Sequence, residues 1–295
     1  MDVNNTTQDN SILTILPPIP LGYNNNYTDF ITYVLTCIII GIGLLLTLIA
    51  IYSLYSQVRN DHVAPIYVMN LLISDLIQLC CMICDVAQTT SFMISLIGSD
   101  IYSYSLMTSV FFMVCIALER YLLIVFPLWY RCRRTTKSTV VICVVAWVLP
   151  SLFFFSLFFD VNVYIPQIIS TVFLLLPFPL LIFFCCATLK VLSASVSILP
   201  EEKQRIVATL VLMLLIYTLL FLPYIVCSIV WNYTNYKSLI KPLLDPRAFL
   251  KLNPLADLIL YIFMKKGALD KLLASVCCCR VEDKDVSTLE NSTNV

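Results

Sequence analysis

Among the charged side chains inside long apolar stretches of the chain, where a charge needs a partner or a function, five suggest a chemistry. They are Asp75, Asp85, Arg247, Lys251 and Asp257. Ionisable groups in hydrocarbon are costly, and they usually pair with one another or face a polar cavity. The chemistry that these residues offer is ion binding, because paired carboxylates suit a hard cation and paired basic groups suit an anion.

The basic pair consists of Arg247 and Lys251, which stand four residues apart. In a helix this spacing places both side chains on one side. Together they form an electropositive cup that suits a carboxylate or a phosphate, and the planar guanidinium matches either group. Asp85 leaves an alternative open, in which it forms an internal salt bridge with Lys251 and no ligand is involved. Both interpretations hold if Asp85 takes one cation and the ligand takes the other.

The composition indicates that these groups sit in a membrane protein. Hydrophobic residues make up 60% of the 295 residues and charged residues only 12%, against about 45–50% and about 25% in soluble proteins. A chain of this size is too apolar for one water-soluble core. This excludes a soluble enzyme, a disordered chain and a collagen or disulfide scaffold. The net charge of zero offers no basic footprint for nucleic acid.

Seven apolar stretches approach or exceed the roughly 20 residues that a helix needs to cross the hydrocarbon core. They cover residues 30–55, 65–89, 97–126, 139–159, 164–192, 205–231 and 246–264. We therefore expect an all-α fold: a bundle of seven transmembrane helices at 30–264, preceded by an N-terminal segment at 1–29.

The distribution of basic residues predicts the orientation, because Lys and Arg concentrate in cytoplasmic loops. Fourteen basic residues fall on the side that carries the C-terminus, and only Lys237 and Lys241 fall in segments on the other side. The N-terminus is therefore expected outside the cell and the C-terminus inside. Acceptor sequences for N-glycosylation agree, since four of the five lie on the expected outer side, at Asn4, Asn5, Asn26 and Asn232. The fifth, Asn291, lies on the expected inner side and should stay unmodified.

The spans carry an ordered set of motifs: Asp75 in the second, Glu119-Arg120-Tyr121 at the end of the third, Trp147 in the fourth, Pro177 and Pro179 in the fifth, Phe221-Leu222-Pro223 in the sixth, and Asn253-Pro254 and Asp257 to Tyr261 in the seventh. In this order they resemble a rhodopsin-like (class A) G-protein-coupled receptor over about residues 30–280. The chain further resembles the branch of nucleotide, lysolipid and proton-sensing receptors, which often carry Asp and Phe at the positions of Asp257 and Phe221.

The resemblance implies a switch for a heterotrimeric G protein at the inner end of the bundle. Its residues would be Glu119, Arg120, Tyr121, Asp257 and Tyr261, with Arg120 contacting the G protein when the sixth span swings outward. Glu119 and Arg120 are adjacent opposite charges that neutralise each other until a conformational change frees the Arg. The alternative is an interfacial Arg120 that only reaches towards the lipid headgroups.

The resemblance also implies a sodium ion in a polar cavity. Asp75 would bind it, and Ser109, Asn253 and Asp257 would line the same cavity, providing the oxygen ligands that a hard cation prefers. The alternative is a protonated Asp75 hydrogen-bonded to Asn253 without an ion. No other cofactor is expected.

The ligand expected for such a receptor is a small anion, such as a lysolipid, a fatty acid or a nucleotide. Arg247 and Lys251 would grip it, Asp85 would lie beside them, and the apolar and aromatic wall would consist of Tyr102, Leu106, Phe221 and Tyr224. No enzymatic activity is expected. Three alternatives stay open: a proton sensor that uses Asp75 and Asp257, an opsin-like photoreceptor in which Lys251 forms a Schiff base, and a transporter or non-signalling membrane protein.

Three positions depart from the pattern of the family. Ser95 stands where a cysteine usually joins the second outer loop, and that loop has no cysteine either. Thr47 replaces the usual Asn of the first span, and Leu258 replaces the proline that usually kinks the seventh.

The last part of the chain predicts attachment to the inner leaflet. Residues 265–276 form an amphipathic pattern that would lie on membrane lipids. Cys277, Cys278 and Cys279 follow directly, positioned for palmitoylation, with a plain cytosolic thiol cluster as the alternative. The remaining tail, within residues 277–295, is expected to be disordered, and its Ser and Thr residues suit receptor kinases and arrestin.

Overall fold

The computed structural model describes residues 26–58, 66–87, 92–133, 136–158, 164–194, 200–233 and 246–265. Every regular element in these ranges is a helix: α1 (Asn26–Val58), α2 (Ile66–Val86), α3 (Phe92–Val125), α4 (Pro127–Arg133), α5 (Thr136–Phe158), α6 (Tyr164–Leu175), α7 (Pro177–Ala194), α8 (Pro200–Tyr233), α9 (Pro246–Lys251) and α10 (Asn253–Met264). The expected all-α fold is confirmed.

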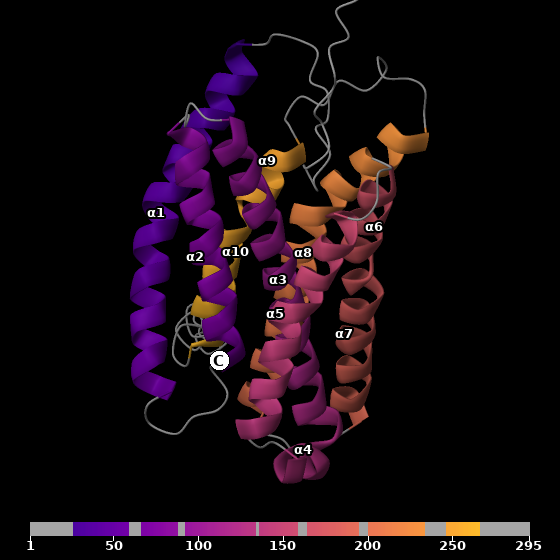
Figure 1. Cartoon of the computed structure of the whole chain (residues 1–295). Coiled ribbons are helices and arrows are strands. Elements are labelled where there is room, and N and C mark those ends of the chain that lie inside the picture. The colour runs from indigo at the N-terminus through magenta and orange to yellow at the C-terminus, as the bar shows by residue number, and fades with distance from the viewer. Residues whose placement is uncertain are drawn as a thin grey trace, which may run out of the picture.

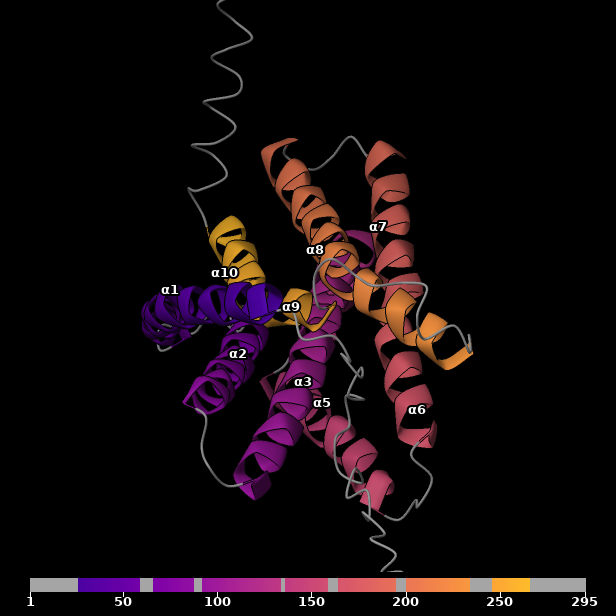
Figure 2. The ribbon, with the colours of Figure 1, turned by 90° about the horizontal axis from the view of Figure 1, so that it is seen from above.

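The helices form one bundle around α3 (Figures 1 and 2). This central helix contacts α2, α5, α7 and α8, while α1 packs on α2 and on α10. The bundle has two ends: α1 begins and α2 ends at the upper end of Figure 1, and α4 lies at the lower end. The Asp85 and Lys251 positions are near the upper end, and the Glu119-Arg120 pair is near the lower end.

The long helices match the expected spans. Within the described residues, five helices are long and apolar enough to cross a membrane, and shorter apolar helical stretches cover Lys137–Ser151 and Asn253–Met264. The first of these stretches belongs to α5, in the place of the fourth span, and the second to α10, in the place of the seventh.

Two expected spans are each divided into two helices, which the span prediction did not anticipate. The fifth span breaks at Leu176, because Pro177 and Pro179 lack the N–H that continues a helix. The seventh breaks at Leu252, where the N–H of Leu252 donates to Phe249 O at 3.1 Å in a tightened turn. Pro254 then follows as the second residue of α10, a position that tolerates the missing N–H.

The short helix α4 was also missing from the sequence prediction, which treated this region as a basic loop. It begins at Pro127, whose fixed backbone angle suits the first position of a helix. The bend at Phe126 separates it from α3, and the N–H of Tyr130 donates to Phe126 O at 2.9 Å. The bend thus brings Tyr130 of α4 back beside the last turns of α3.

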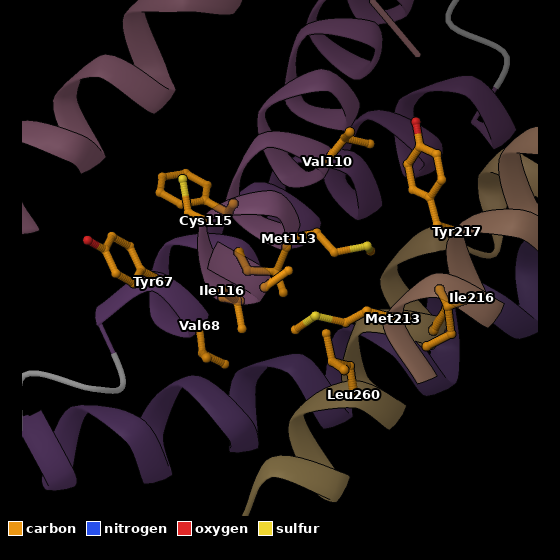
Figure 3. Packing of buried hydrophobic residues seen from close by; sticks show 14 of the residues in the cluster. Tyr67, Val68, Val110, Met113, Cys115, Ile116, Met213, Ile216, Tyr217 and Leu260 are labelled. Carbon is orange, nitrogen blue, oxygen red and sulfur yellow. The ribbon is translucent and has the colours of Figure 1, made fainter. Parts of the chain in front are cut away.

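The core runs along the axis of the bundle and joins α2, α3, α8 and α10 (Figure 3). Val68, Ile116, Met213 and Leu260 are among the buried residues that meet there. The outward faces are also apolar, with exposed residues such as Leu45, Ile49 and Tyr52 along α1. An apolar exterior around a bundle with buried polar groups is what a lipid environment requires, since lipid and not water covers the outer face.

Candidate functional site

The four residues predicted to line the polar cavity meet in the middle of the bundle. The amide Nδ2 of Asn253 donates to Ser109 Oγ at 3.0 Å and to Asp257 Oδ2 at 3.1 Å, and it lies 3.4 Å from Asp75 Oδ1. The hydroxyl of Ser109 also donates to Asp257 Oδ2, at 2.8 Å. All four side chains are fully buried, so the contact joins α2, α3 and α10 at one point.

The helix break at Leu252 explains why α10 contributes two groups to this cavity. Asn253 is the first residue of α10, and Asp257 follows one turn later. Residues four apart lie on the same face of a helix. The amide of Asn253 therefore reaches both the carboxylate of its own helix and the one on α2.

Gln78 also belongs to the cavity, although the sequence analysis did not select it. Its Nε2 donates to Asp75 Oδ1 at 3.2 Å, and the side chain is fully buried. The signal was present in the sequence, because Gln78 stands one turn after Asp75 on the same helix. A carboxamide at that spacing is a natural partner for a buried carboxylate.

Several oxygen atoms in the cavity have no hydrogen-bond partner among the described atoms: Asp75 Oδ2, Gln78 Oε1, Asn253 Oδ1 and Asp257 Oδ1. Buried polar atoms are rarely left without a partner. A set of carboxylate and amide oxygens is what a hard cation prefers. The donor set therefore fits a sodium ion, while the described residues contain no cluster of three His, Cys, Asp or Glu side chains that would suit a more demanding metal.

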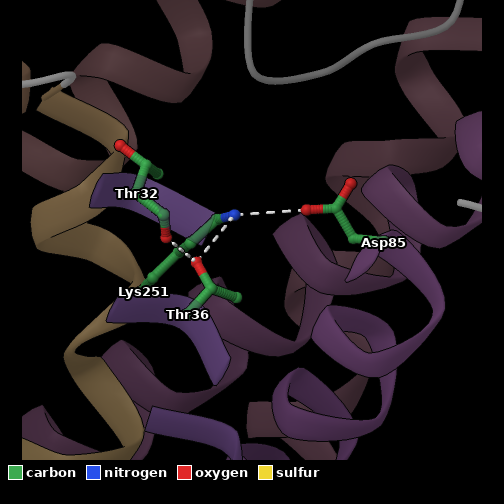
Figure 4. A network of polar contacts seen from close by, with 4 residues as sticks. All are labelled: Thr32, Thr36, Asp85 and Lys251. Carbon is green, nitrogen blue, oxygen red and sulfur yellow. Dashed lines mark hydrogen bonds and ion pairs between the residues drawn. The ribbon is translucent and has the colours of Figure 1, made fainter. Parts of the chain in front are cut away.

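A second polar group lies nearer the upper end and joins three helices (Figure 4). The Nζ of Lys251 lies 3.2 Å from Asp85 Oδ2 and 3.5 Å from Thr36 Oγ1. The hydroxyl of Thr36 donates in turn to Thr32 O at 2.7 Å. The salt bridge that the sequence analysis left as an alternative is present, and it connects α9 to α2 while Thr36 adds α1.

Two of the residues predicted to form the apolar and aromatic wall of the ligand site are buried in the core. Phe221 and Tyr224 are fully buried on α8, and the ring of Phe221 stacks on that of Tyr217 with centroids 4.5 Å apart. The hydroxyl of Tyr217 donates to Leu174 O, next to the break in the fifth span. The sequence analysis did not select Tyr217, which links α8 to α6.

Leu106 and Tyr102 lie on α3 one turn apart, with Leu106 buried and Tyr102 half-buried. The hydroxyl of Tyr102 is buried and has no hydrogen-bond partner among the described atoms. Arg247 is half-buried at the start of α9, one turn before Lys251. These residues share the upper half of the bundle with the Asp85–Lys251 pair.

The lower end of the bundle holds the predicted switch residues of α3. Glu119 is buried, and its Oε1 accepts a hydrogen bond from the hydroxyl of Tyr130 at 2.6 Å. Arg120, the next residue, is half-buried. Tyr121 contacts the rings of Phe183 and Phe184 on α7, with centroids 5.8 and 5.3 Å away. The sequence analysis missed Tyr130, because nothing in the sequence indicates that α4 turns back onto Glu119.

The other two predicted switch residues, Asp257 and Tyr261, lie on α10 and not beside Glu119 and Arg120 at the end of α3. Asp257 belongs to the polar cavity, and Tyr261 follows one turn lower and is buried. The Nζ of Lys265 lies 6.0 Å from the ring centroid of Tyr261 and 3.1 Å from Ser53 Oγ on α1. The structure thus spreads the five residues along α3 and α10 instead of forming one cluster.

Most of the predicted modification sites lie outside the described residues. These are Asn4, Asn5, Cys277, Cys278 and Cys279, together with the amphipathic segment after residue 265. Asn26 is the first residue of α1 and Asn232 is the second-last residue of α8. Both helix ends belong to the upper end of the bundle, where the sequence analysis expects glycans.

A comparison with protein families identifies the class of this protein. The model of the 7 transmembrane receptor (rhodopsin family) matches residues 45–261, which includes the polar cavity, the salt bridge and the Glu119-Arg120 pair. The chain belongs to this family, and the predicted resemblance to rhodopsin-like receptors is confirmed. It is a multi-pass membrane protein.

Individual relatives include receptors for angiotensin II. The chain is 29% identical over 159 residues to the type-1 angiotensin II receptor of Ovis aries, and 28% identical over the same length to that of Homo sapiens and to the type-1 angiotensin II receptor B of Rattus norvegicus. Each match covers 52% of this chain and 44% of the relative. The chain thus matches less than half the length of these relatives, and the predicted nucleotide, lysolipid and proton-sensing branch stays a prediction.

Proposed function

We propose that this protein is a plasma-membrane receptor that binds a small anion at the upper end of the bundle and activates a heterotrimeric G protein at the lower end. The observation that supports the ligand class is the pair Arg247 and Lys251, two basic residues one turn apart on α9 in the upper half of a rhodopsin-family bundle. Lys251 pairs with Asp85 within the protein, and two basic groups on one side of a helix suit an anionic ligand, because the planar guanidinium of Arg matches both carboxylates and phosphates.

The upper end faces the outside of the cell in this proposal. The chain segments at that end carry few Lys and Arg residues and contain four of the five glycosylation sequences, whereas the segments at the lower end are basic. The N-terminus is then extracellular, and the C-terminus, with its palmitoylation candidates Cys277 to Cys279, lies on the cytoplasmic side.

The route between the two ends passes through the polar cavity. Lys251 ends α9, and Asn253, two residues later, donates to groups on α3 and α10. A ligand that changes the position of α9 therefore changes the contacts of Asn253 with Ser109 and Asp257. The ligand shifts the equilibrium only by its difference in affinity for the inactive and active packings.

Arg120 is the residue that we assign to the G protein. It lies in the last turns of α3 at the cytoplasmic end, beside Glu119, which accepts a hydrogen bond from Tyr130. Tyr121, whose ring packs on α7, and the pair Asp257 and Tyr261 on α10 would adjust to the outward movement of α8. Receptor kinases and arrestin would then act on the Ser and Thr residues of the C-terminal tail.

A sodium ion in the polar cavity forms part of this proposal. Asp75 and Asp257 would hold it, with Ser109 and the side-chain oxygens of Asn253 and Gln78 as further ligands. The ion would neutralise part of the negative charge of two buried carboxylates. The oxygens without partners in this cavity support the assignment.

The ligand class is tested with matched pairs of compounds that differ only in the anionic group. Suitable pairs are oleate with its methyl ester, lysophosphatidic acid with the corresponding monoacylglycerol, and ATP with adenosine; angiotensin II is added because the relatives are named for it. G-protein activation is measured in cells that express the full chain. We expect a response to an anionic member and none to its neutral partner.

The same assay tests Arg247 directly. Arg247→Gln removes the charge and is expected to raise the EC50 of the active anion by about tenfold or more, the loss of one ionic contact of about 1.4 kcal/mol. Arg247→Lys retains the charge and serves as the matched control, with a smaller shift. Equal potency on all three receptors at equal surface expression would contradict the anion site.

A further inference from the structure

We propose that Asp85 is an internal competitor for the ligand: its carboxylate occupies Lys251 when no ligand is bound, and the anionic group of the ligand replaces it. This inference rests on the proposed anion-binding function and adds to it the mechanism by which binding loosens the upper end of the bundle. The ligand would thus exchange one anion for another at the same ammonium group.

The contacts of Lys251 favour an exchange over simple addition of a ligand. A lysine ammonium has three donor positions, and two of the groups within its reach are Asp85 Oδ2 at 3.2 Å and Thr36 Oγ1 at 3.5 Å. Thr36 uses its own proton to donate to Thr32 O, so towards Lys251 it can only accept. The contact between Lys251 and Thr36 on α1 therefore stays available when Asp85 leaves. It keeps the Lys251 ammonium in place for the incoming anion.

The two members of the salt bridge differ in their exposure. The side chain of Asp85 is 61% exposed and that of Lys251 is 22% exposed. Asp85 is the second-last residue of α2, so a released carboxylate would lie exposed at the end of the helix. Lys251 lies deeper and would be left without a counter-charge. Because an unpaired charge is less favourable in a half-buried position than in an exposed one, Lys251 favours a state in which some anion is bound.

The exchange has a mechanical consequence, because Asp85 and Lys251 connect the second and seventh spans. A lower connection between the same spans exists at the cavity, where Asn253 lies 3.4 Å from Asp75. Asp75 and Asp85 are about 15 Å apart along α2 at 1.5 Å per residue. Release of the upper connection would let the end of α2 separate from α9, while the break at Leu252 lets α9 move relative to α10.

The test uses purified full-length receptor and inorganic phosphate as the probe, with sodium chloride at equal ionic strength as the reference. Binding is measured from the rise of the thermal unfolding midpoint with phosphate concentration. If the internal pair is formed in about nine-tenths of the molecules, its removal improves the apparent Kd about tenfold. We therefore expect Asp85→Asn to bind phosphate about tenfold more tightly than the unchanged receptor, and Asp85→Glu to resemble the unchanged receptor.

Two further variants keep the result interpretable. Adding Lys251→Gln to Asp85→Asn should abolish the gain. The exchanged pair Asp85→Lys with Lys251→Asp keeps a salt bridge but reverses its polarity, and it should fold while showing no gain in phosphate affinity. Phosphate affinity of Asp85→Asn that equals or falls below that of the unchanged receptor would overturn the proposal, as would a gain that survives Lys251→Gln.

The agonist assay separates this inference from the proposed function. If Arg247→Gln weakens the anionic agonist but Asp85→Asn binds phosphate no better, the receptor binds anions and Asp85 is not a competitor. If Arg247→Gln and Lys251→Gln both leave agonist potency unchanged, the anion-binding function itself is wrong.

Discussion

Asn253 makes the densest set of contacts of any single side chain in the polar cavity. Its amide donates to Ser109 and Asp257 and approaches Asp75, and all of these groups are fully buried. Loss of a buried donor leaves its acceptors unsatisfied, which costs about 1–3 kcal/mol. We expect Asn253→Ala to lower the free energy of unfolding by about that amount, measured by thermal or denaturant unfolding of purified receptor.

The control for this variant lies on the opposite face of the same helix. Ile262 is exposed towards the lipid, so Ile262→Ala should change the free energy of unfolding by clearly less. Similar losses for both variants would mean that the polar contacts of the cavity add little to stability.

Asp75 provides a separate test of cation binding at the residue level. An ion that binds the folded state raises the unfolding midpoint with its concentration. We expect sodium chloride to stabilise the receptor relative to choline chloride at equal ionic strength, and Asp75→Asn to remove that difference. Asp85→Asn, which lies outside the cavity, should keep it. A sodium effect that persists in Asp75→Asn would place the ion elsewhere.

The sequence identified the charged residues of both polar groups but not all of their partners. Asp75, Ser109, Asn253 and Asp257 meet as the resemblance to rhodopsin-like receptors implied. Tyr130 could not be found, because its contact with Glu119 depends on the bend at Phe126. Thr36 could not be found either, because a threonine in an apolar helix usually bonds to its own backbone, as Thr36 also does.

At the level of the helices, the break in the seventh span controls where Asn253 points. Pro254 has no N–H to continue α9 through Leu252. Pro254→Ala restores that donor, and we expect α9 and α10 to join into a more regular helix that turns Asn253 away from Ser109. The expected result is a loss of agonist-stimulated G-protein activation of about tenfold or more in potency, an effect of about 1.4 kcal/mol.

The matched control for this change is Pro150→Ala in α5, a proline inside a helix that does not contribute to the cavity. Normal signalling by Pro254→Ala would show that the break is not needed for transmission. Surface expression must be equal for all three receptors.

A hydrogen bond connects α4 to α3. Tyr130 donates to Glu119 from the middle of this seven-residue helix, which is too short to be stable alone. We expect Tyr130→Phe to increase amide hydrogen exchange in residues 127–133 by about tenfold or more, since hydrogen bonds to charged groups contribute about 1.5–3 kcal/mol. Unchanged exchange in α4, compared with α2 as an internal reference, would mean that other contacts hold it.

The helix boundaries show which features of the helices could be predicted from the sequence. Hydrophobic length predicted seven spans, because a bilayer demands about 20 apolar residues per helix. Within the described residues, five of these spans correspond to helices long and apolar enough to cross a membrane and two to shorter apolar helices. The divisions at Leu176 and Leu252 were not predicted, because the hydrophobicity of a stretch of about 20 residues does not reveal a break that is only one turn long. Pro177, Pro179 and Pro254 were each noticed as motif residues, but a proline alone does not determine whether a helix bends or separates.

For the whole molecule, the proposed function requires an odd number of membrane crossings, with the two ends of the chain on opposite sides of the membrane. The asymmetry of Lys and Arg predicts this orientation. We expect an N-terminal epitope tag to be detected on intact cells, and a C-terminal tag to be detected only after permeabilisation. Detection of both tags under the same condition would overturn the orientation.

The most direct test of the central claim, that a signal passes from the upper end to a G protein at Arg120, is guanine-nucleotide exchange on purified G protein by reconstituted receptor. Arg120→Ala should still bind the anionic agonist, because Arg120 lies at the far end of α3 from Lys251, but should fail to accelerate exchange. Arg133→Ala, a loss of charge in the neighbouring α4, should retain at least part of the activity. Agonist-stimulated exchange by Arg120→Ala at the rate of the unchanged receptor would contradict the account.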